Sequence, residues 1–285
     1  MTEITLGSGG LETQEELRAA LEEVRRWEKD QRQLMIWERL TRLPFKLLDK
    51  LTPKIVHEKI GLLLDELGSY IQNGGNYLVA GRKVGELVGE VSSETAGKRE
   101  GPYPLAVMDE AARRLSKSRS NFATAQGATT GFGGVFTLAA DIPAILGLSL
   151  KVIQEIGLCY GYNPLEKEER IFAVKVMQLA SADTVGKRAI LEELDLELGS
   201  DGRIGGGEGA AVSKIQGWRE VIAAYRDNWS SKKLLQTIPV AGMFFGAYTN
   251  REMLKAVAEA AMMLYRKRRI LTRLADNGQT NTLST

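Results

Sequence analysis

The chain has 285 residues, of which 44% are hydrophobic and 26% are charged. This balance is typical of an ordered globular protein and excludes an intrinsically disordered chain. The mean hydropathy of −0.17 is too low for a polytopic membrane protein. The formal net charge of +2 creates no global field that would attract nucleic acid.

The first half of the chain is predicted to be helical from residue 13 onward. Thr13 and Glu16 have the spacing of a capping box, in which each side chain accepts a backbone N–H at the start of a helix. This helix is expected to continue to about Arg42. Further helices are predicted over residues 52–72, 76–87 and 105–126, with a polar loop over residues 91–104.

The glycine-rich segment 127–150 contains a single charged side chain, that of Asp141. Asp141-Ile142-Pro143 divides the apolar sequence into parts too short to cross a bilayer, which needs about 20 apolar residues. Aspartate is a good N-cap and proline fits a first helical turn, so a helix is predicted from Ile142 to Cys159. Gly161 is its expected C-terminal cap.

After residue 163, helices are predicted over residues 164–182, 184–198, 210–228 and 250–275, with a flexible glycine-rich linker over residues 199–209. A second apolar stretch with glycines, residues 237–248, also has an Ile-Pro pair near its start. No long alternating strand pattern is present. The sequence therefore predicts an all-α fold, a multi-helix globular bundle with two Gly-rich, Pro-broken apolar helical hairpins.

We expect three parts along the chain: an N-terminal charged helix over residues 1–42, a helical domain over residues 43–275 and a disordered tail over residues 276–285. Cys159 is the only cysteine and His57 the only histidine, so the usual zinc ligand sets are excluded. We expect no metal and no cofactor. The lone cysteine and the absence of a visible secretory signal favour the cytoplasm or the inner face of the cell membrane.

Six residues in or near the first apolar segment are candidate ligand-binding residues: Gly131, Gly133, Gly134, Asp141, Tyr160 and Tyr162. Glycine amides can cradle a phosphate, but close helix packing is the simpler interpretation of these glycines. Asp141 either binds a cation or a polar headgroup, or caps the helix that follows it. The two tyrosines either stack on a ligand or pack around the helix cap.

In the last predicted helix, four consecutive basic residues follow the apolar positions expected in the core: Arg266, Lys267, Arg268 and Arg269. Basic side chains near a helix C-terminus interact favourably with the helix dipole. They also suit contact with anionic lipid, where each contributes about 1 kcal/mol. We therefore treat them as candidate membrane-contact residues. Cys159 lies at the end of an apolar helix, where a thiol packs as a small hydrophobe rather than acting as a nucleophile.

Several short motifs, taken in order, resemble the EcsC protein family, a bacterial family named after a partner of an ABC transporter. They are the glycine run at 127–134, Ala140 to Pro143, Tyr160-Gly161-Tyr162, Glu169-Arg170, and Ile238 to Gly242 with Gly246 and Asn250. The resemblance covers roughly residues 40–272. It implies a bacterial helical protein linked to membranes and transport, and it supplies no catalytic mechanism.

The leading hypothesis is a non-enzymatic, membrane-associated accessory protein. Its expected partners are an anionic membrane surface or a membrane transport protein, with a lipid-like ligand in the glycine-rich core and no nucleic acid. The alternative is a soluble hydrolase of lipids or peptides that uses Asp141 with the nearby tyrosines. A third hypothesis is an interaction module whose N-terminal helix presents Trp27 and Trp37.

Overall fold

The computed structural model describes residues 11–32, 79–95, 102–130, 135–182, 184–204 and 239–283. These residues form seven helices: α1 (Gln14–Arg32), α5 (Gly81–Thr95), α6 (Leu105–Thr130), α7 (Val135–Cys159), α8 (Lys167–Ser181), α9 (Thr184–Glu197) and α12 (Pro239–Leu283). Within the described ranges the only β-type pairing is one isolated bridge, between Leu198 and Ile204. The predicted all-α fold is therefore confirmed.

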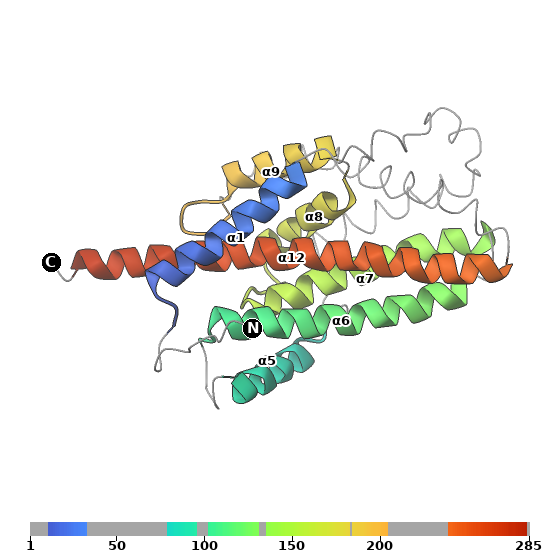
Figure 1. Ribbon diagram of the computed structural model, residues 1–285, viewed down its shortest axis with the longest axis horizontal. Helices are drawn as coiled ribbons and strands as arrows, with labels where there is room; N and C mark the ends of the chain where they lie inside the picture. The colour runs from blue at the N-terminus through green and yellow to red at the C-terminus, as the bar shows by residue number, and fades with distance from the viewer. Residues whose placement is uncertain are drawn as a thin grey trace.

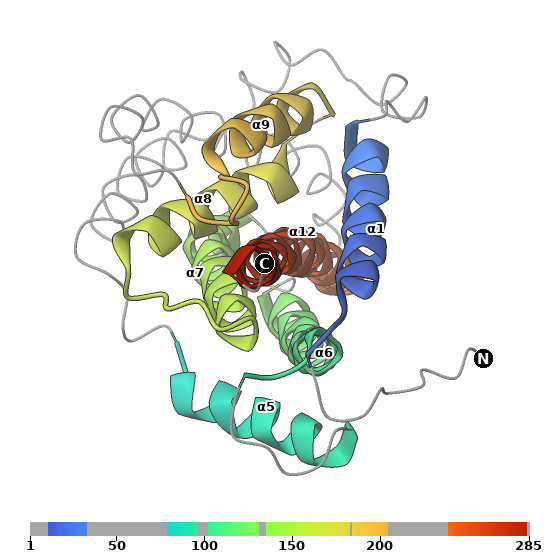
Figure 2. The same ribbon diagram turned by 90° about the vertical axis from the view of Figure 1, so that its left-hand side faces the viewer.

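The long helix α12 lies at the centre of the molecule, and α1, α6, α7 and α8 all pack against it (Figure 2). Helix α5 covers α6 and α7 on the outside, while α9 contacts α1 and α8. The inward positions of α12 are Leu254, Val257, Ala261, Leu264 and Tyr265, each at most 3% exposed. Their spacing of three, four and three residues places them on one face of the helix, as in the apolar stripe of an amphipathic helix.

Two predicted helix ends are confirmed in detail. The backbone N–H of Thr13 donates to Glu16 Oε2 at 2.8 Å, and that of Glu16 donates to Thr13 Oγ1 at 3.2 Å, which completes the capping box. At the end of α7, Gly161 has a φ of +79°. There the N–H of Tyr162 donates to the carbonyl of Gly157 and that of Gly161 to the carbonyl of Leu158, both at 2.9 Å. This is a Schellman motif.

Helix α7 begins at Val135 rather than at Ile142, so the prediction that Asp141 is an N-cap is wrong. Asp141 and Pro143 both lie inside a continuous helix. An interior proline costs about 3 kcal/mol, because it removes one backbone hydrogen bond and crowds the preceding turn. Tertiary packing can offset such a cost, and the second half of α7 is deeply buried through Ile153 and Ile156.

Other helix boundaries also differ from the predicted ones. Helix α5 begins at Gly81 and continues to Thr95, through the start of the predicted loop, because Val84, Val88 and Val91 bury one face of it. Helix α12 begins at Pro239 rather than near residue 250, and it continues to Leu283 through most of the expected tail. Helix α8 begins at Lys167 rather than at Pro164, whereas α9 matches its predicted range closely. The helices predicted over residues 52–72 and 210–228 lie outside the described residues.

The first part of the predicted flexible linker is a tight turn against α12. The N–H of Gly199 donates to the carbonyl of Arg203 at 2.9 Å, and that of Gly202 to the carbonyl of Gly199 at 3.0 Å. Gly202 has a φ of +75°, and a Cβ there would lie 2.3 Å from the carbonyl oxygen of Arg268. Only glycine fits such a position. Residues 205–209 lie outside the described ranges.

The uncharged ends of three helices meet at one end of the bundle. Helix α6 ends there, and α7 and α12 begin there (Figure 1, right). We call residues 123–130, 135–146 and 239–250 the apolar end; Asp141 is the only charged residue among them. Among the described residues, none of the helices combines the length and the apolar character that a membrane crossing requires.

Candidate functional site

The predicted basic run lies in the middle of the bundle and is directed at other helices. Arg268 is 4% exposed and makes a two-pronged ion pair with Glu169 of α8, with N–O distances of 2.8 and 2.6 Å. Its guanidinium carbon lies 4.1 Å from the ring centroid of Tyr162 and 4.4 Å from that of Phe172. Burial acts to lower the pKa of Arg268, but the hydrogen bonds and charge of Glu169 raise it overall.

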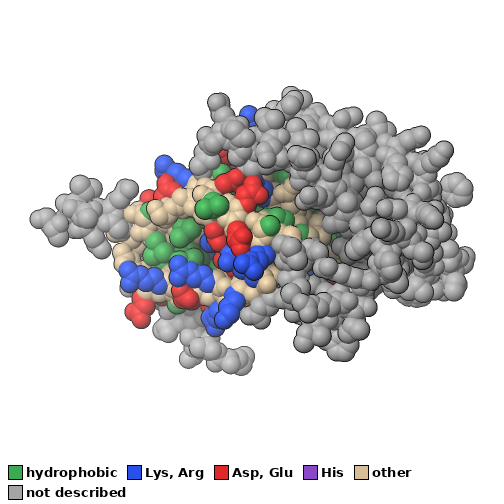
Figure 3. All heavy atoms as spheres, turned by 90° about the horizontal axis from the view of Figure 1, so that it is seen from above, with side chains coloured by type: hydrophobic (Ala, Val, Ile, Leu, Met, Phe, Trp, Pro, Cys, Tyr) green, Lys and Arg blue, Asp and Glu red, His purple; other side chains and the backbone are tan. Residues whose placement is uncertain are grey.

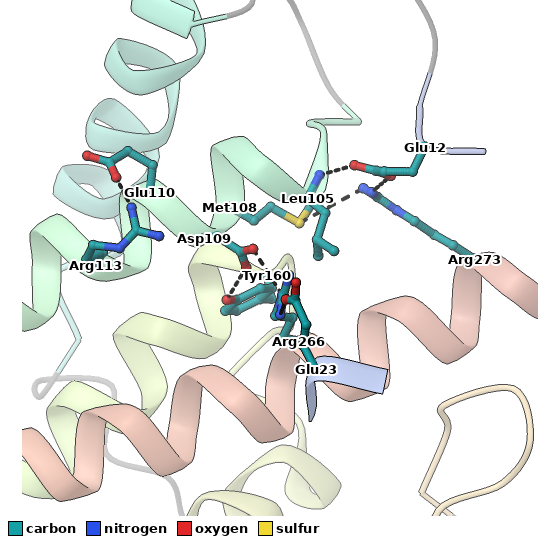
Figure 4. Close-up of polar contacts among 10 residues, drawn as sticks. All are labelled: Glu12, Glu23, Leu105, Met108, Asp109, Glu110, Arg113, Tyr160, Arg266 and Arg273. Atoms are coloured by element: carbon teal, nitrogen blue, oxygen red, sulfur yellow. Dashed lines mark hydrogen bonds and ion pairs between the residues drawn. The ribbon is translucent and has the colours of Figure 1, made fainter. Parts of the chain in front are cut away.

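Arg266 joins α12 to α6 and α1. Its Nη1 lies 2.7 Å from Glu23 Oε2 and its Nε 3.0 Å from Asp109 Oδ2 (Figure 4). The other oxygen of Asp109 accepts a hydrogen bond of 2.6 Å from the hydroxyl of Tyr160. Burial raises the pKa of Asp109, an effect that the charge of Arg266 opposes in part. Burial and the neighbouring Asp109 also raise the pKa of Tyr160 well above its ordinary value, so the phenol stays neutral.

Arg269 caps the C-terminal end of α7. Its Nε donates to the carbonyl oxygen of Tyr160 at 2.8 Å. Carbonyls at the end of a helix lack partners within the helix, and the helix dipole favours a cation there. A Cβ at Gly161 would lie 2.8 Å from Nη2 of Arg269, so a larger residue would displace the guanidinium in addition to straining the backbone at its φ of +79°. Burial lowers the pKa of Arg269.

Lys267 and Arg273 also join α12 to other parts of the bundle. Lys267 Nζ lies 2.7 Å from Glu28 Oε1 of α1 and 2.6 Å from Asp195 Oδ1 of α9. Arg273 pairs with Glu12 (Figure 4). It also donates to the carbonyl of Tyr103, which lies just before α6. The five basic residues of α12 thus hold α1, α6, α7, α8 and α9 around it. We call them the basic hub: Arg266, Lys267, Arg268, Arg269 and Arg273.

The internal ion pairs of the hub leave little of its charge available for the predicted membrane contact. The side chains of Arg266, Lys267 and Arg268 are only 16%, 12% and 4% exposed, and each is paired with a carboxylate of another helix. They do not form an open basic face, because helical periodicity turns consecutive residues toward different neighbours. Contact with anionic lipid would require these ion pairs to break.

Among the described candidate ligand-binding residues, Asp141 lies far from the two tyrosines. Tyr160 is fully buried, and the ring of Tyr162 lies 5.3 Å from that of Tyr265, so both tyrosines pack around the end of α7. Asp141 lies in the same helix about 28 Å away, at 1.5 Å per residue. A single site could contact Asp141 and these tyrosines only by spanning that distance, and the hydrolase alternative stays a prediction. The side chain of Asp141 and the glycines at 131, 133 and 134 lie outside what the structure describes.

Cys159 is 2% exposed, and burial together with Glu155 raises its pKa to about 12. The predicted inert, buried thiol is confirmed. No group of three or more metal-ligating side chains that could hold an ion occurs among the described residues.

The sequence interpretation missed the carboxylates that pair with the hub. Asp109, Glu28 and Asp195 are not among the candidate residues, and Glu169 appears only within a family motif. One signal was present for Asp109: it lies beside the buried positions Met108 and Ala112 of α6. A charge next to an apolar stripe indicates a buried partner.

A polar cleft of about 490 Å³ opens beside the hub, between α1, the turn after α9, and α12. Its walls are Leu21, Arg25, Glu28, Lys29, Arg32, Asp195, Leu198, Gly199, Ser200, Lys267 and Leu271. Lys267 lies in the floor, where its two ion pairs hold α1 and α9 apart at a fixed spacing. The sequence pattern gave no indication of this cleft, because its residues come from three distant segments.

These features define an all-α protein organised around a basic central helix. The chain belongs to the EcsC protein family, which matches residues 18–270. The match begins within α1, further toward the N-terminus than the resemblance indicated.

Two proteins of Bacillus subtilis (strain 168) are similar to the chain. The uncharacterized protein YdbA is 53% identical over 270 residues, which cover 93% of this chain and 97% of YdbA. Protein EcsC is 27% identical over 164 residues, which cover 58% of this chain and 64% of that protein. No solved structure matches the chain.

Proposed function

We propose that the chain is a non-enzymatic accessory protein that binds the inner face of the cell membrane through its apolar end. The observation that carries this proposal is the convergence of three nearly uncharged helix ends at one end of the bundle (Figure 1). A helix that is apolar on all sides is stable only where protein or lipid covers it. The apolar sequences at the starts of α7 and α12 favour contact with a membrane or a partner over exposure to water.

The proposal differs from simple electrostatic binding. Arg266, Arg268 and Arg273 pair with internal carboxylates, so little of their charge remains for lipid headgroups. Attachment therefore depends on shallow insertion of apolar side chains, whose favourable free energy scales with the apolar area removed from water, at about 25 cal/mol per Å². Such binding is weakly dependent on salt, whereas binding through exposed basic residues is screened.

Vesicle flotation tests the proposal. Purified protein is mixed with vesicles of phosphatidylcholine alone or with phosphatidylglycerol, at low and at high salt. We expect the protein to float with both kinds of vesicle and to remain bound at high salt. A variant with Phe244→Ser and Phe245→Ser, in the apolar end, should lose most of this binding.

The matched control is Leu196→Ser, which removes an apolar side chain that is 88% exposed on α9, in another part of the molecule. It should float like the unaltered protein, and circular dichroism should show that both variants are folded. Two results would contradict the proposal: no binding to protein-free vesicles, or binding that high salt abolishes. The first result combined with sedimentation in native membranes would indicate a membrane transport protein as the partner.

A further inference from the structure

The polar cleft beside the hub has the dimensions and the chemistry of an anion-binding site. Its volume of about 490 Å³ lies within the usual range of ligand sites, about 300 to 1,000 Å³. One wall is α1, the second is the turn that follows α9, and the floor is α12. Figure 3 shows the molecule from the side of α1 and α9, where basic and acidic side chains lie close together.

The charges that line the cleft do not cancel. Four cationic side chains face two carboxylates: Arg25, Lys29, Arg32 and Lys267 against Glu28 and Asp195. Both carboxylates already have cationic partners. Glu28 pairs with Lys267 at 2.7 Å, while Asp195 pairs with Lys267 at 2.6 Å and with Arg32 at 2.7 Å. Arg25 pairs at 2.6 Å with Glu22, which does not line the cleft. Among the described residues, Lys29 is then the lining cation without an ion pair, and it gives the lining an excess of positive charge.

The cleft also has hydrogen-bond donors without acceptors. Arg32 Nε is buried and has no hydrogen-bond partner among the described residues. Lys29 is exposed and forms no ion pair with any described residue. The hydroxyl of Ser200 likewise forms no hydrogen bond with a described residue. A buried donor without an acceptor costs about 1–3 kcal/mol, so a small shift of Arg32 toward an added acceptor is favourable.

We propose that this cleft binds a phosphate group. A phosphate presents several strong acceptors and negative charge at one point, which matches a guanidinium, an ammonium and a hydroxyl placed around a polar cleft. Arg32 contributes directional hydrogen bonds, Lys29 contributes a point charge at the rim, and Lys267 holds the carboxylates that would otherwise repel the ligand.

The position of the cleft favours a water-soluble phosphorylated compound over a lipid headgroup. Lys267 lies about 35 Å along α12 from Phe244 in the apolar end, at 1.5 Å per residue. That distance exceeds the roughly 30 Å thickness of the bilayer hydrocarbon core. A molecule attached to a membrane by its apolar end would hold the cleft away from that surface. The choice of a soluble compound thus rests on the proposed membrane attachment, whereas the phosphate site itself rests only on the lining of the cleft.

Isothermal titration calorimetry on the full chain tests the site. The probes are inorganic phosphate, glycerol 3-phosphate, succinate, and vesicles that contain phosphatidic acid. We expect both phosphate compounds to bind and succinate to bind much more weakly. Lys29→Gln should weaken phosphate binding about tenfold, because it removes a charged hydrogen-bond donor from the rim of the cleft.

Arg26→Gln is the matched control. Arg26 is exposed on the same helix and carries the same charge, but it does not line the cleft. It should leave phosphate binding unchanged, and both variants should melt at the temperature of the unaltered protein. Equal affinities of the Lys29 variant and the unaltered protein would overturn the proposal, as would an absence of phosphate binding or equal binding of succinate. Binding to phosphatidic acid vesicles but to neither soluble phosphate compound would refute the proposal that the ligand is water-soluble.

Discussion

Replacing Arg268 by methionine should destabilise the protein severely, because it leaves a carboxylate buried without its partner. Glu169 is only 5% exposed, and both of its oxygens accept hydrogen bonds from the guanidinium. Removing one partner of such a buried pair costs about 3–5 kcal/mol. The lost stacking of the guanidinium on Tyr162 and Phe172 adds about 1 kcal/mol.

The assay is equilibrium unfolding in urea, followed by circular dichroism, for both single variants and for the pair. Glu169→Met should cost a similar amount, and the double variant should cost less than either single change, because it leaves no buried charge. The control is the exposed pair of α9, where Arg188→Met should change the free energy of unfolding by less than about 0.5 kcal/mol. Costs that simply add in the double variant, or a cost below about 1 kcal/mol for Arg268→Met, would refute the reasoning.

Three further predictions concern the end of α7 and its neighbours. Gly161→Ala should cost at least about 1–2 kcal/mol in urea unfolding, from its positive φ and its contact with Arg269. Gly85→Ala, in open space on α5, should instead stabilise by about 0.5–1 kcal/mol; equal effects would contradict this account. The raised pKa of Asp109 means that the folded state binds more protons than the unfolded state. The contribution of this site to stability should fall as pH rises from about 3.8 through the folded pKa, and Asp109→Asn should remove that slope from urea titrations at several pH values. Cys159, with a pKa of about 12, should react with a thiol reagent at neutral pH only as fast as the protein opens, whereas fast stoichiometric labelling would show an accessible thiol.

Local features of the fold could be predicted from the sequence because their causes lie within a few residues. The capping box of Thr13 and Glu16 and the glycine cap at Gly161 depend on neighbours at most five positions away. The start of α7 could not be predicted in the same way. Asp141 and Pro143 are strong local start signals, yet the helix continues through both of them. Propensity is a weak guide where packing along the rest of a helix opposes it.

The internal ion pairs of the hub could not be predicted from the sequence either. The sequence displays four adjacent basic residues but not their partners, which lie up to 243 positions away, as between Arg266 and Glu23. A basic run on a predicted terminal helix is usually solvated, and only the central position of α12 makes it internal. The same separation hides the cleft, because Arg32, Ser200 and Lys267 meet only in three dimensions. The division of the chain into three parts and its cellular location stay predictions.

The central position of α12 has a consequence for how the protein is made. Ribosomes complete α12 after all the helices that pack around it, so the apolar faces of α1, α6, α7 and α8 have no common surface to bury against until then. Glu23, Glu28 and Glu169 likewise lack their cationic partners until α12 has been synthesised. Folding of the bundle should therefore wait until α12 has been synthesised, and it is dominated by contacts between distant segments, which slows it. The incomplete chain exposes apolar surface in the meantime, and it is a natural client for chaperones.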